Sequence, residues 1–209
     1  PKTTNVKKDY TASKNFFKNI FKTPYDEIKN VAKSPKSYFI IILISFITWV
    51  VAELIGGLIN LIKNMVSFSW YSNIFSYLAD SFMDIIGLFF TILGPAIIIA
   101  ALSLIIYLFM KNKKKNYLTI ASTLIVAYIP VITSSIISLL GYVNTYVARF
   151  TNTYASFCSV ITAILTYFAI KALYSEEDDN KATITYLIVM GIYFAFAFVL
   201  RLFGISILF

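Results

Sequence analysis

Three charged residues lie inside or at the edge of long apolar stretches of this 209-residue chain: Glu53, Asp84 and Arg201. A charge in such surroundings loses its hydration, so it needs an oppositely charged partner or a water-filled cavity. The pattern predicts that Arg201 pairs with Glu53 or with Asp84. Two interpretations stay open: a structural ion pair that fixes the helix register, and a polar cleft that binds a lipid headgroup or an ion.

Residues that could carry out enzymatic chemistry are not found in recognisable patterns. The chain has no histidine, and Cys158 is its only cysteine. An internal disulfide, a Cys/His zinc site and histidine-based catalysis are therefore excluded within this chain. The sequence also has no glycine-rich phosphate loop, no GxSxG motif and no HExxH motif. We expect no enzymatic activity, no metal and no cofactor.

The composition is far more apolar than that of a soluble protein. Hydrophobic residues make up 59% of the chain and charged residues 13%, whereas soluble domains carry about 25% charged residues. A soluble fold of this length leaves much of its area in water and cannot hide so much apolar surface. The composition therefore predicts an all-α, polytopic membrane protein.

Five apolar stretches are long enough to cross a hydrocarbon core of about 30 Å as helices. The first 37 residues form a lysine-rich arm with amphipathic helices, and residues 38–209 form the transmembrane domain. The predicted spans are 38–62, 85–110, 117–140, 154–174 and 183–209.

Two prolines interrupt predicted spans. Pro95 lies in the second span and Pro130 in the third, and a proline inside a helix removes one backbone hydrogen bond. We expect helix kinks at both residues, with neighbouring helices satisfying the freed carbonyls. Such breaks can also form binding sites near the bilayer midplane, and this alternative stays open.

Two further segments are predicted to be amphipathic helices. Between residues 13 and 22, Phe17, Ile20 and Phe21 share one side of a helix. Such a helix can lie among lipid headgroups, or it can pack on the cytoplasmic face of the protein itself. Residues 63–86 predict a second interfacial helix, at the outer boundary.

Basic residues are gathered on one side of the predicted membrane. Fifteen of the eighteen would face that side, so the positive-inside rule puts the N-terminus in the cytoplasm and the C-terminus outside the cell membrane. No nucleic-acid readout motif accompanies the charge. The expected partners are anionic membrane lipids, together with a protein partner or further copies of the chain. The expected headgroup contacts are Lys14, Lys18, Lys22, Lys111, Lys113, Lys114 and Lys115.

The order of several short motifs resembles that of the Yip domain family, whose name refers to interaction with Ypt/Rab GTPases. These motifs are Ser34-Pro35 before the first span, Ala127-Tyr128-Ile129-Pro130 in the third, and Phe168 to Leu173 at the exit of the fourth. The resemblance covers residues 24–209 and points to prokaryotic members. It implies a five-helix membrane protein with a cytoplasmic N-terminus.

Eukaryotic members of the Yip family act in vesicle trafficking and membrane shaping and bind prenylated Rab proteins. Their longer entry motif is reduced here to Ser34-Pro35, and their Gly-Tyr pair is Ala127-Tyr128, so Rab binding is not expected. The chain opens on Pro1, and we expect that an N-terminal part has been removed. Many prokaryotic members carry a zinc ribbon at that end.

The function expected from the sequence is a non-enzymatic, membrane-organising or lipid-interacting scaffold of the Yip type. The alternative is a small transporter or channel component with a polar path in the outer half of the bundle. A subunit that docks to a larger complex through apolar helix faces is a third interpretation, which the sequence does not separate from the other two.

Overall fold

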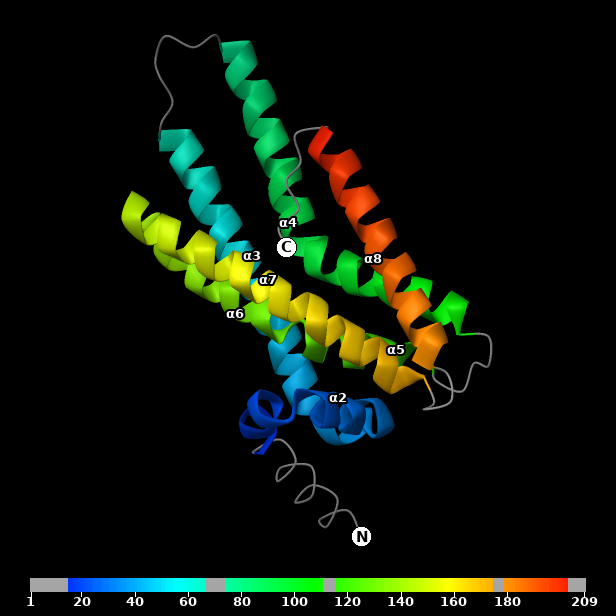
Figure 1. Cartoon of the computed structure of the whole chain (residues 1–209). Helices are drawn as coiled ribbons and strands as arrows, with labels where there is room; N and C mark the ends of the chain where they lie inside the picture. The colour runs from blue at the N-terminus through cyan, green and yellow to red at the C-terminus, as the bar shows by residue number, and fades with distance from the viewer. Residues whose placement is uncertain (1–14, 67–73, 111–115, 175–178, 203–209) are drawn as a thin grey trace.

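The computed structural model describes residues 15–66, 74–110, 116–174 and 179–202 of the chain (Figure 1). These residues are almost entirely helical and contain no strand, so the predicted all-α class is confirmed. Residues 15–22 form a first helical segment. The elements that follow are α2 (Pro24–Lys33), η1 (Pro35–Tyr38), α3 (Phe39–Val66), α4 (Ile74–Phe109), α5 (Tyr117–Ala127), α6 (Ile129–Ser138), η2 (Leu139–Tyr142), α7 (Thr145–Leu173) and α8 (Asp179–Leu202).

Two helical stretches are long and apolar enough to cross a membrane, namely Pro35–Lys63 and Thr145–Leu173. A third is added if the bent pair Tyr117–Ala127 and Ile129–Tyr142 forms one span. The described part of α4 contributes a shorter apolar segment, Leu93–Phe109. The described residues thus show two or three candidate spans, and the predicted number of five is not shown.

Several element boundaries differ from those predicted. Helix α3 continues to Val66, and α4 begins at Ile74 and runs on to Phe109. Residues 74–86 are therefore the first part of a long helix and not a separate helix. No proline or glycine stands between Ile74 and Ile86 to end it.

The fourth span also begins earlier than predicted, because Asn144 caps α7. Its side-chain oxygen accepts a hydrogen bond from the backbone N–H of Val147 at 2.9 Å, which satisfies one of the free donors at a helix start. Residues 141–153, which lie between the third and fourth predicted spans, are therefore mostly helical, and Arg149 is part of α7.

The chain bends in the third predicted span. Helices α5 and α6 meet at 49°, with Tyr128 between them and Pro130 in the first turn of α6. Pro130 cannot donate a hydrogen bond to Val126, and its ring disfavours a continuous helix across this point. Pro95 lies inside α4, and Figure 1 shows that α4 also turns along its length.

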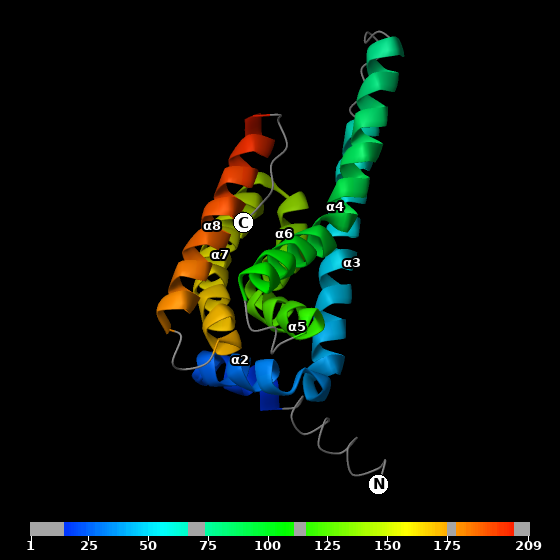
Figure 2. The same ribbon diagram turned by 90° about the vertical axis from the view of Figure 1, so that its right-hand side faces the viewer.

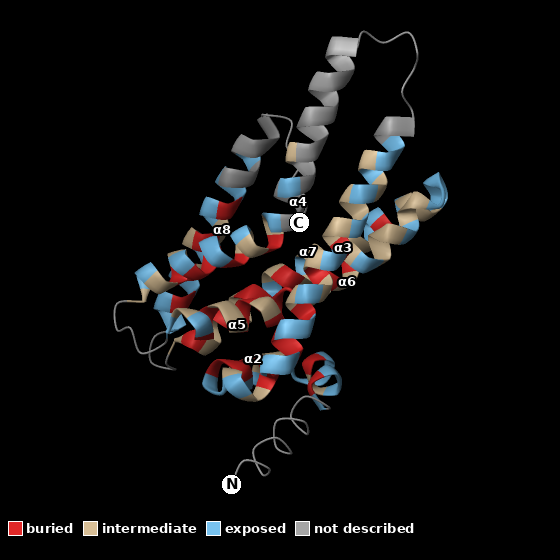
Figure 3. Ribbon diagram, turned by 180° about the vertical axis from the view of Figure 1, so that it is seen from behind, coloured by how far each residue is buried: buried red, intermediate tan, exposed pale blue. Residues whose placement is uncertain are grey.

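Helix α7 packs against α2, α5, α6, η2 and α8, while α3 packs against α4, α5 and α6. Helix α2 lies across one end of the bundle (Figure 2). Buried residues gather where α5 and α2 meet the neighbouring helices (Figure 3), and they include Ile28, Ile120, Leu124 and Ile170. Large apolar side chains such as Ile44, Leu108, Leu118, Phe157 and Leu187 lie exposed on the outside of the bundle. Exposed apolar surface of this extent fits a lipid surrounding.

The connection between η2 and α7 depends on a glycine. A Cβ atom at Gly141 would lie 2.8 Å from the Thr151 hydroxyl oxygen and 3.2 Å from the backbone of Ala148. Any larger residue would push η2 away from α7. We therefore expect Gly141→Ala to lower the free energy of unfolding by about 1–3 kcal/mol, measured by chemical denaturation of the full chain in detergent.

Gly191→Ala in α8 is the matched control, because no atom lies within 4 Å of a Cβ placed there. This change should leave the free energy of unfolding unchanged or raise it by up to about 1 kcal/mol, since alanine is the better helix former. Equal effects of the two substitutions would contradict the close approach of η2 to α7.

Candidate functional site

Glu53 lies on α3, in the middle of the chain's first candidate span, and its partner comes from α6. The Ser135 hydroxyl donates a hydrogen bond to Oε1 of Glu53 at 2.8 Å. Both side chains are half-buried. Because Ser135 follows the bend at Tyr128, the direction of α6 after that bend brings its hydroxyl to α3.

Polar contacts continue along the same face of α3. Glu53, Gly56, Asn60 and Lys63 are spaced by three or four residues, which aligns them on one side of a helix. The Tyr142 hydroxyl donates to the carbonyl oxygen of Gly56 at 3.1 Å and is also hydrogen-bonded to Asn60. The ammonium of Lys63 lies 4.6 Å from the centroid of the Tyr142 ring. We call this row the polar seam; its members are Glu53, Gly56, Asn60 and Lys63 of α3, Ser135 of α6 and Tyr142 of η2.

The polar seam joins α3 to α6 and η2 by hydrogen bonds. A hydrogen bond to a carboxylate is stronger than one between neutral groups, and in apolar surroundings it offsets part of the cost of placing Glu53 there. Within the described residues, Glu53 has no basic group within ion-pair distance. The Ser135 hydroxyl and the Glu53 carboxylate satisfy each other across two helices, which fits the structural interpretation left open for Glu53.

Of the three residues in the predicted ion pair, the structure describes the side chain of Glu53. Asp84 belongs to α4 and Arg201 to α8, but the side chains of both lie outside the described residues. The pairing of Arg201 with either carboxylate stays a prediction. Tyr142 was not predicted as a partner of α3, although it lies seven residues after Ser135, a spacing that places both on one side of a helix.

The first helical segment has two different faces. Phe16 and Ile20 are buried, with exposed fractions of 0% and 6%, whereas Phe17 and Phe21 are 53% and 84% exposed. The two interpretations left open for this segment therefore apply to two neighbouring faces: Phe16 and Ile20 pack on the protein, whereas Phe17 and Phe21 face outward. Ile20 was predicted to share the side of Phe17 and Phe21, and that prediction is wrong. Phe16, absent from the predicted apolar side, is the residue that anchors the segment.

A buried carboxylate holds this segment against α2 and η1. Glu27 of α2 is only 4% exposed. It accepts a hydrogen bond from Nδ2 of Asn19 at 3.4 Å and is hydrogen-bonded to the Tyr38 hydroxyl. The Phe16 ring contacts the Tyr38 ring at a centroid distance of 5.9 Å. We call this group of residues 15–33 with Tyr38 the platform.

The platform also contacts the far end of α7. The Tyr25 ring lies 5.6 Å from the Phe168 ring, and Lys171 forms an ion pair with Asp179 of α8 at 2.8 Å. Partly exposed pairs of this kind contribute little to stability. The ion pair joins α7 to α8, whereas the ring contact between Tyr25 and Phe168 links the platform to α7.

The predicted lipid-contacting lysines are only partly described. Lys18 and Lys22 are exposed on the first helical segment. The other predicted contacts lie outside the described residues; they are Lys14, Lys111, Lys113, Lys114 and Lys115. Among the residues that the structure describes, no three His, Cys, Asp or Glu side chains form a group that could hold a metal ion.

The fold defines a helical protein with two or three helices that could cross a membrane, which is consistent with a membrane location. Comparison of the chain with protein-family models, with curated proteins and with solved structures found no match. The resemblance to the Yip domain family therefore stays a prediction from its short motifs.

The contact between Glu53 and Ser135 can be tested by a double-mutant cycle. Glu53→Met and Ser135→Ala each remove one partner, and we expect a coupling free energy of about 0.6–2 kcal/mol between them. The measurement is the free energy of unfolding of the full chain in bicelles made of lipid and detergent.

Ser134→Ala is the matched control for this cycle. The Ser134 hydroxyl donates to the carbonyl oxygen of Val131 in its own helix at 2.8 Å, so its change should show no coupling to Glu53→Met. Coupling of similar size for both serines would remove the assignment of Ser135 as the specific partner of Glu53.

Proposed function

We propose that this chain is a non-enzymatic membrane scaffold of the Yip type, which binds anionic lipid at its cytoplasmic face through the first helical segment. On this proposal five helices span the cell membrane, with the N-terminus in the cytoplasm and the C-terminus outside. The observation that carries the proposal is the exposed face of a segment whose neighbouring face is anchored.

The exposed face has the chemistry of a lipid-binding helix. Phe17 and Phe21 are one helical turn apart and both are exposed, with the edge of the Phe17 ring contacting the buried Phe16 ring at a centroid distance of 5.4 Å. Lys18 and Lys22 are exposed beside them. Apolar rings can enter the boundary between headgroups and acyl chains, while ammonium groups attract anionic headgroups.

The anchoring of the segment supports a scaffold more than a loose tether. Glu27 joins Asn19 to Tyr38 at the start of the first candidate span. The position of Phe17 and Phe21 relative to that span is therefore fixed by buried contacts. A fixed lipid-binding face can orient the whole bundle, whereas a flexible arm could only hold it near the surface.

A probe at Phe21 tests this proposal. In a Cys158→Ala background, a fluorophore on Phe21→Cys in the full chain in nanodiscs should be quenched by brominated lipid. The quenching should rise with the fraction of anionic lipid and fall with added salt. The double substitution Lys18→Gln with Lys22→Gln should weaken the free energy of binding to anionic lipid by about 2 kcal/mol.

Asn30→Cys is the control position for this probe, because Asn30 is exposed on α2, outside the first helical segment. Its fluorophore should be quenched less than the one at residue 21. If quenching at residue 21 ignores both lipid charge and salt, the proposal is wrong.

The second candidate function is a small transporter or channel component, and the polar seam is the observation that favours it. A polar row along a membrane helix can line a water-filled path. The hydrogen bonds that already satisfy Ser135, Tyr142 and Glu53 argue instead for a closed helix contact. We therefore keep the scaffold as the proposed function.

Cysteine accessibility separates these two functions. Ser134 is buried beside the polar seam, and Ser134→Cys should resist aqueous thiol reagents in a scaffold. Asn180→Cys, exposed at the start of α8, should react readily and shows that the reagent is active. Fast reaction at residue 134 in intact membranes would favour the transporter.

A further inference from the structure

A second exposed surface of mixed character lies where η2 meets α7. Val143, Tyr146 and Phe150 are among the most exposed large side chains of the described chain, with Tyr146 at 82%. Arg149 is exposed on the same turns of α7. Lys63 of α3 is also exposed. Its ammonium lies over the ring of Tyr142, the last residue of η2. We call Lys63, Val143, Tyr146, Arg149 and Phe150 the corner.

The corner is held firmly in place. Gly141 allows η2 to approach the backbone of Ala148 closely, and Asn144 caps the start of α7. Tyr142 is fixed by its hydrogen bond to Gly56, and its ring in turn positions the ammonium of Lys63. The cations and rings of the corner therefore keep their places relative to α3 and α7.

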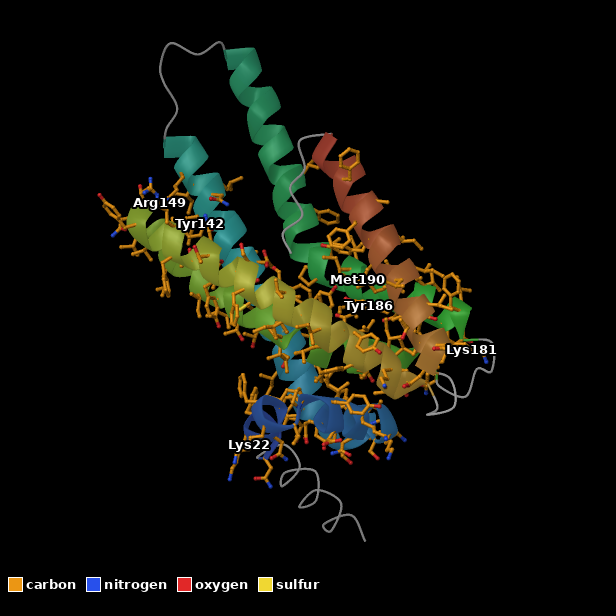
Figure 4. All side chains as sticks on the ribbon, viewed as in Figure 1. Lys22, Tyr142, Arg149, Lys181, Tyr186 and Met190 are labelled. Carbon is orange, nitrogen blue, oxygen red and sulfur yellow. The ribbon has the colours of Figure 1, made fainter. Side chains whose placement is uncertain are left out.

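The corner lies at the opposite end of α7 from the platform. Tyr25 of the platform contacts Phe168, and the distance from Phe168 to Tyr146 along the helix axis is about 33 Å at 1.5 Å per residue. The hydrocarbon core of a bilayer is about 30 Å thick. Figure 4 shows Arg149 and Tyr142 close together at one end of α7, with Lys22 away from them on the platform.

The charged residues of the corner are both positive. It contains two exposed cations, and the described acidic residues lie elsewhere, with Glu53 deeper along α3 and the others at the platform or at the start of α8. Exposed tyrosine and phenylalanine beside arginine and lysine match the boundary between acyl chains and phosphates. An apolar protein partner would not require the two cations.

We propose that the corner is a docking surface for the phosphate groups of anionic phospholipids in the leaflet opposite the platform. Arg149 and Lys63 bind the phosphate region, while Val143, Tyr146 and Phe150 lie against the upper acyl chains. The surface is distinct from the one at Phe17 and Phe21 and acts on the other leaflet. Together the two surfaces fix the bundle at both faces of the membrane.

The test places a fluorophore on Val143→Cys in the full chain, in a Cys158→Ala background, in nanodiscs that contain either brominated phosphatidylglycerol or brominated phosphatidylcholine. At equal mole fraction and low salt, the anionic lipid should quench about two- to fivefold more strongly. The excess should shrink as salt is raised. Inorganic phosphate at constant ionic strength should leave it unchanged, which separates a lipid from a free anion.

Charge variants give the controls. Lys63→Gln with Arg149→Gln should abolish the excess and leave quenching by phosphatidylcholine as it was, which also shows that the variant is folded. Arg149→Lys should retain most of the excess. Lys33→Gln with Lys36→Gln, at the platform end, should have no effect.

Three outcomes overturn this proposal: equal quenching by the two lipids, loss of the excess on addition of inorganic phosphate, and quenching by neither lipid. The last outcome would mean that protein, such as a second copy of the chain, covers the corner. The probe at residue 21 reports on the other leaflet, so failure at one surface is distinguishable from failure at the other.

Discussion

The apolar surroundings required by the outward faces of the helices constrain every polar group in this fold. Where water is scarce, a hydroxyl must find a partner close by. Most of the described ones use a carbonyl of their own helix: Thr123 donates to Thr119, Thr133 to Ile129, Ser134 to Val131 and Ser138 to Ser135. Such bonds satisfy the side chain without joining helices.

Ser135 and Tyr142 differ because they reach across to α3. These two hydrogen bonds fix how α3 is oriented relative to α6 and η2. Apolar packing in lipid does not fix that orientation by itself. Two buried hydroxyls, those of Ser103 and Thr162, have no hydrogen-bond partner among the described residues. Each costs stability of about 1–3 kcal/mol, so the polar seam is the better satisfied part of the interior.

Some features could be predicted from the sequence because they depend on single residues with strong local effects. Proline at residue 130 adjoins the bend between α5 and α6, and Pro24 stands at the start of α2. The helical class followed from the length of the apolar stretches. Other features depend on contacts between segments far apart in the chain, such as Glu53 with Ser135, and no local pattern encodes those.

Helix ends were the least predictable part of the fold. Asn144 lies between the third and fourth predicted spans, and as a cap it lets α7 begin at Thr145, so that Arg149 is part of the helix. The amphipathic pattern of residues 74–86 resembles that of a surface helix, yet no residue there stops α4. In the first segment, periodicity placed Phe17 and Phe21 on one side, as in the structure, but it also placed Ile20 there, whereas Ile20 is buried like Phe16.

The bend at Tyr128 lets one stretch of chain serve two sets of neighbours. Both α5 and α6 pack against α3 and α7, and α5 also packs against α2 and α4. The wide Trp49 ring of α3 lies 5.5 Å from the Tyr128 ring, at the vertex itself. A straight helix could contact α3 along only one line. The bend, with the Trp49 indole packed at its vertex, lets the helices of a small bundle pack around the middle of that bundle.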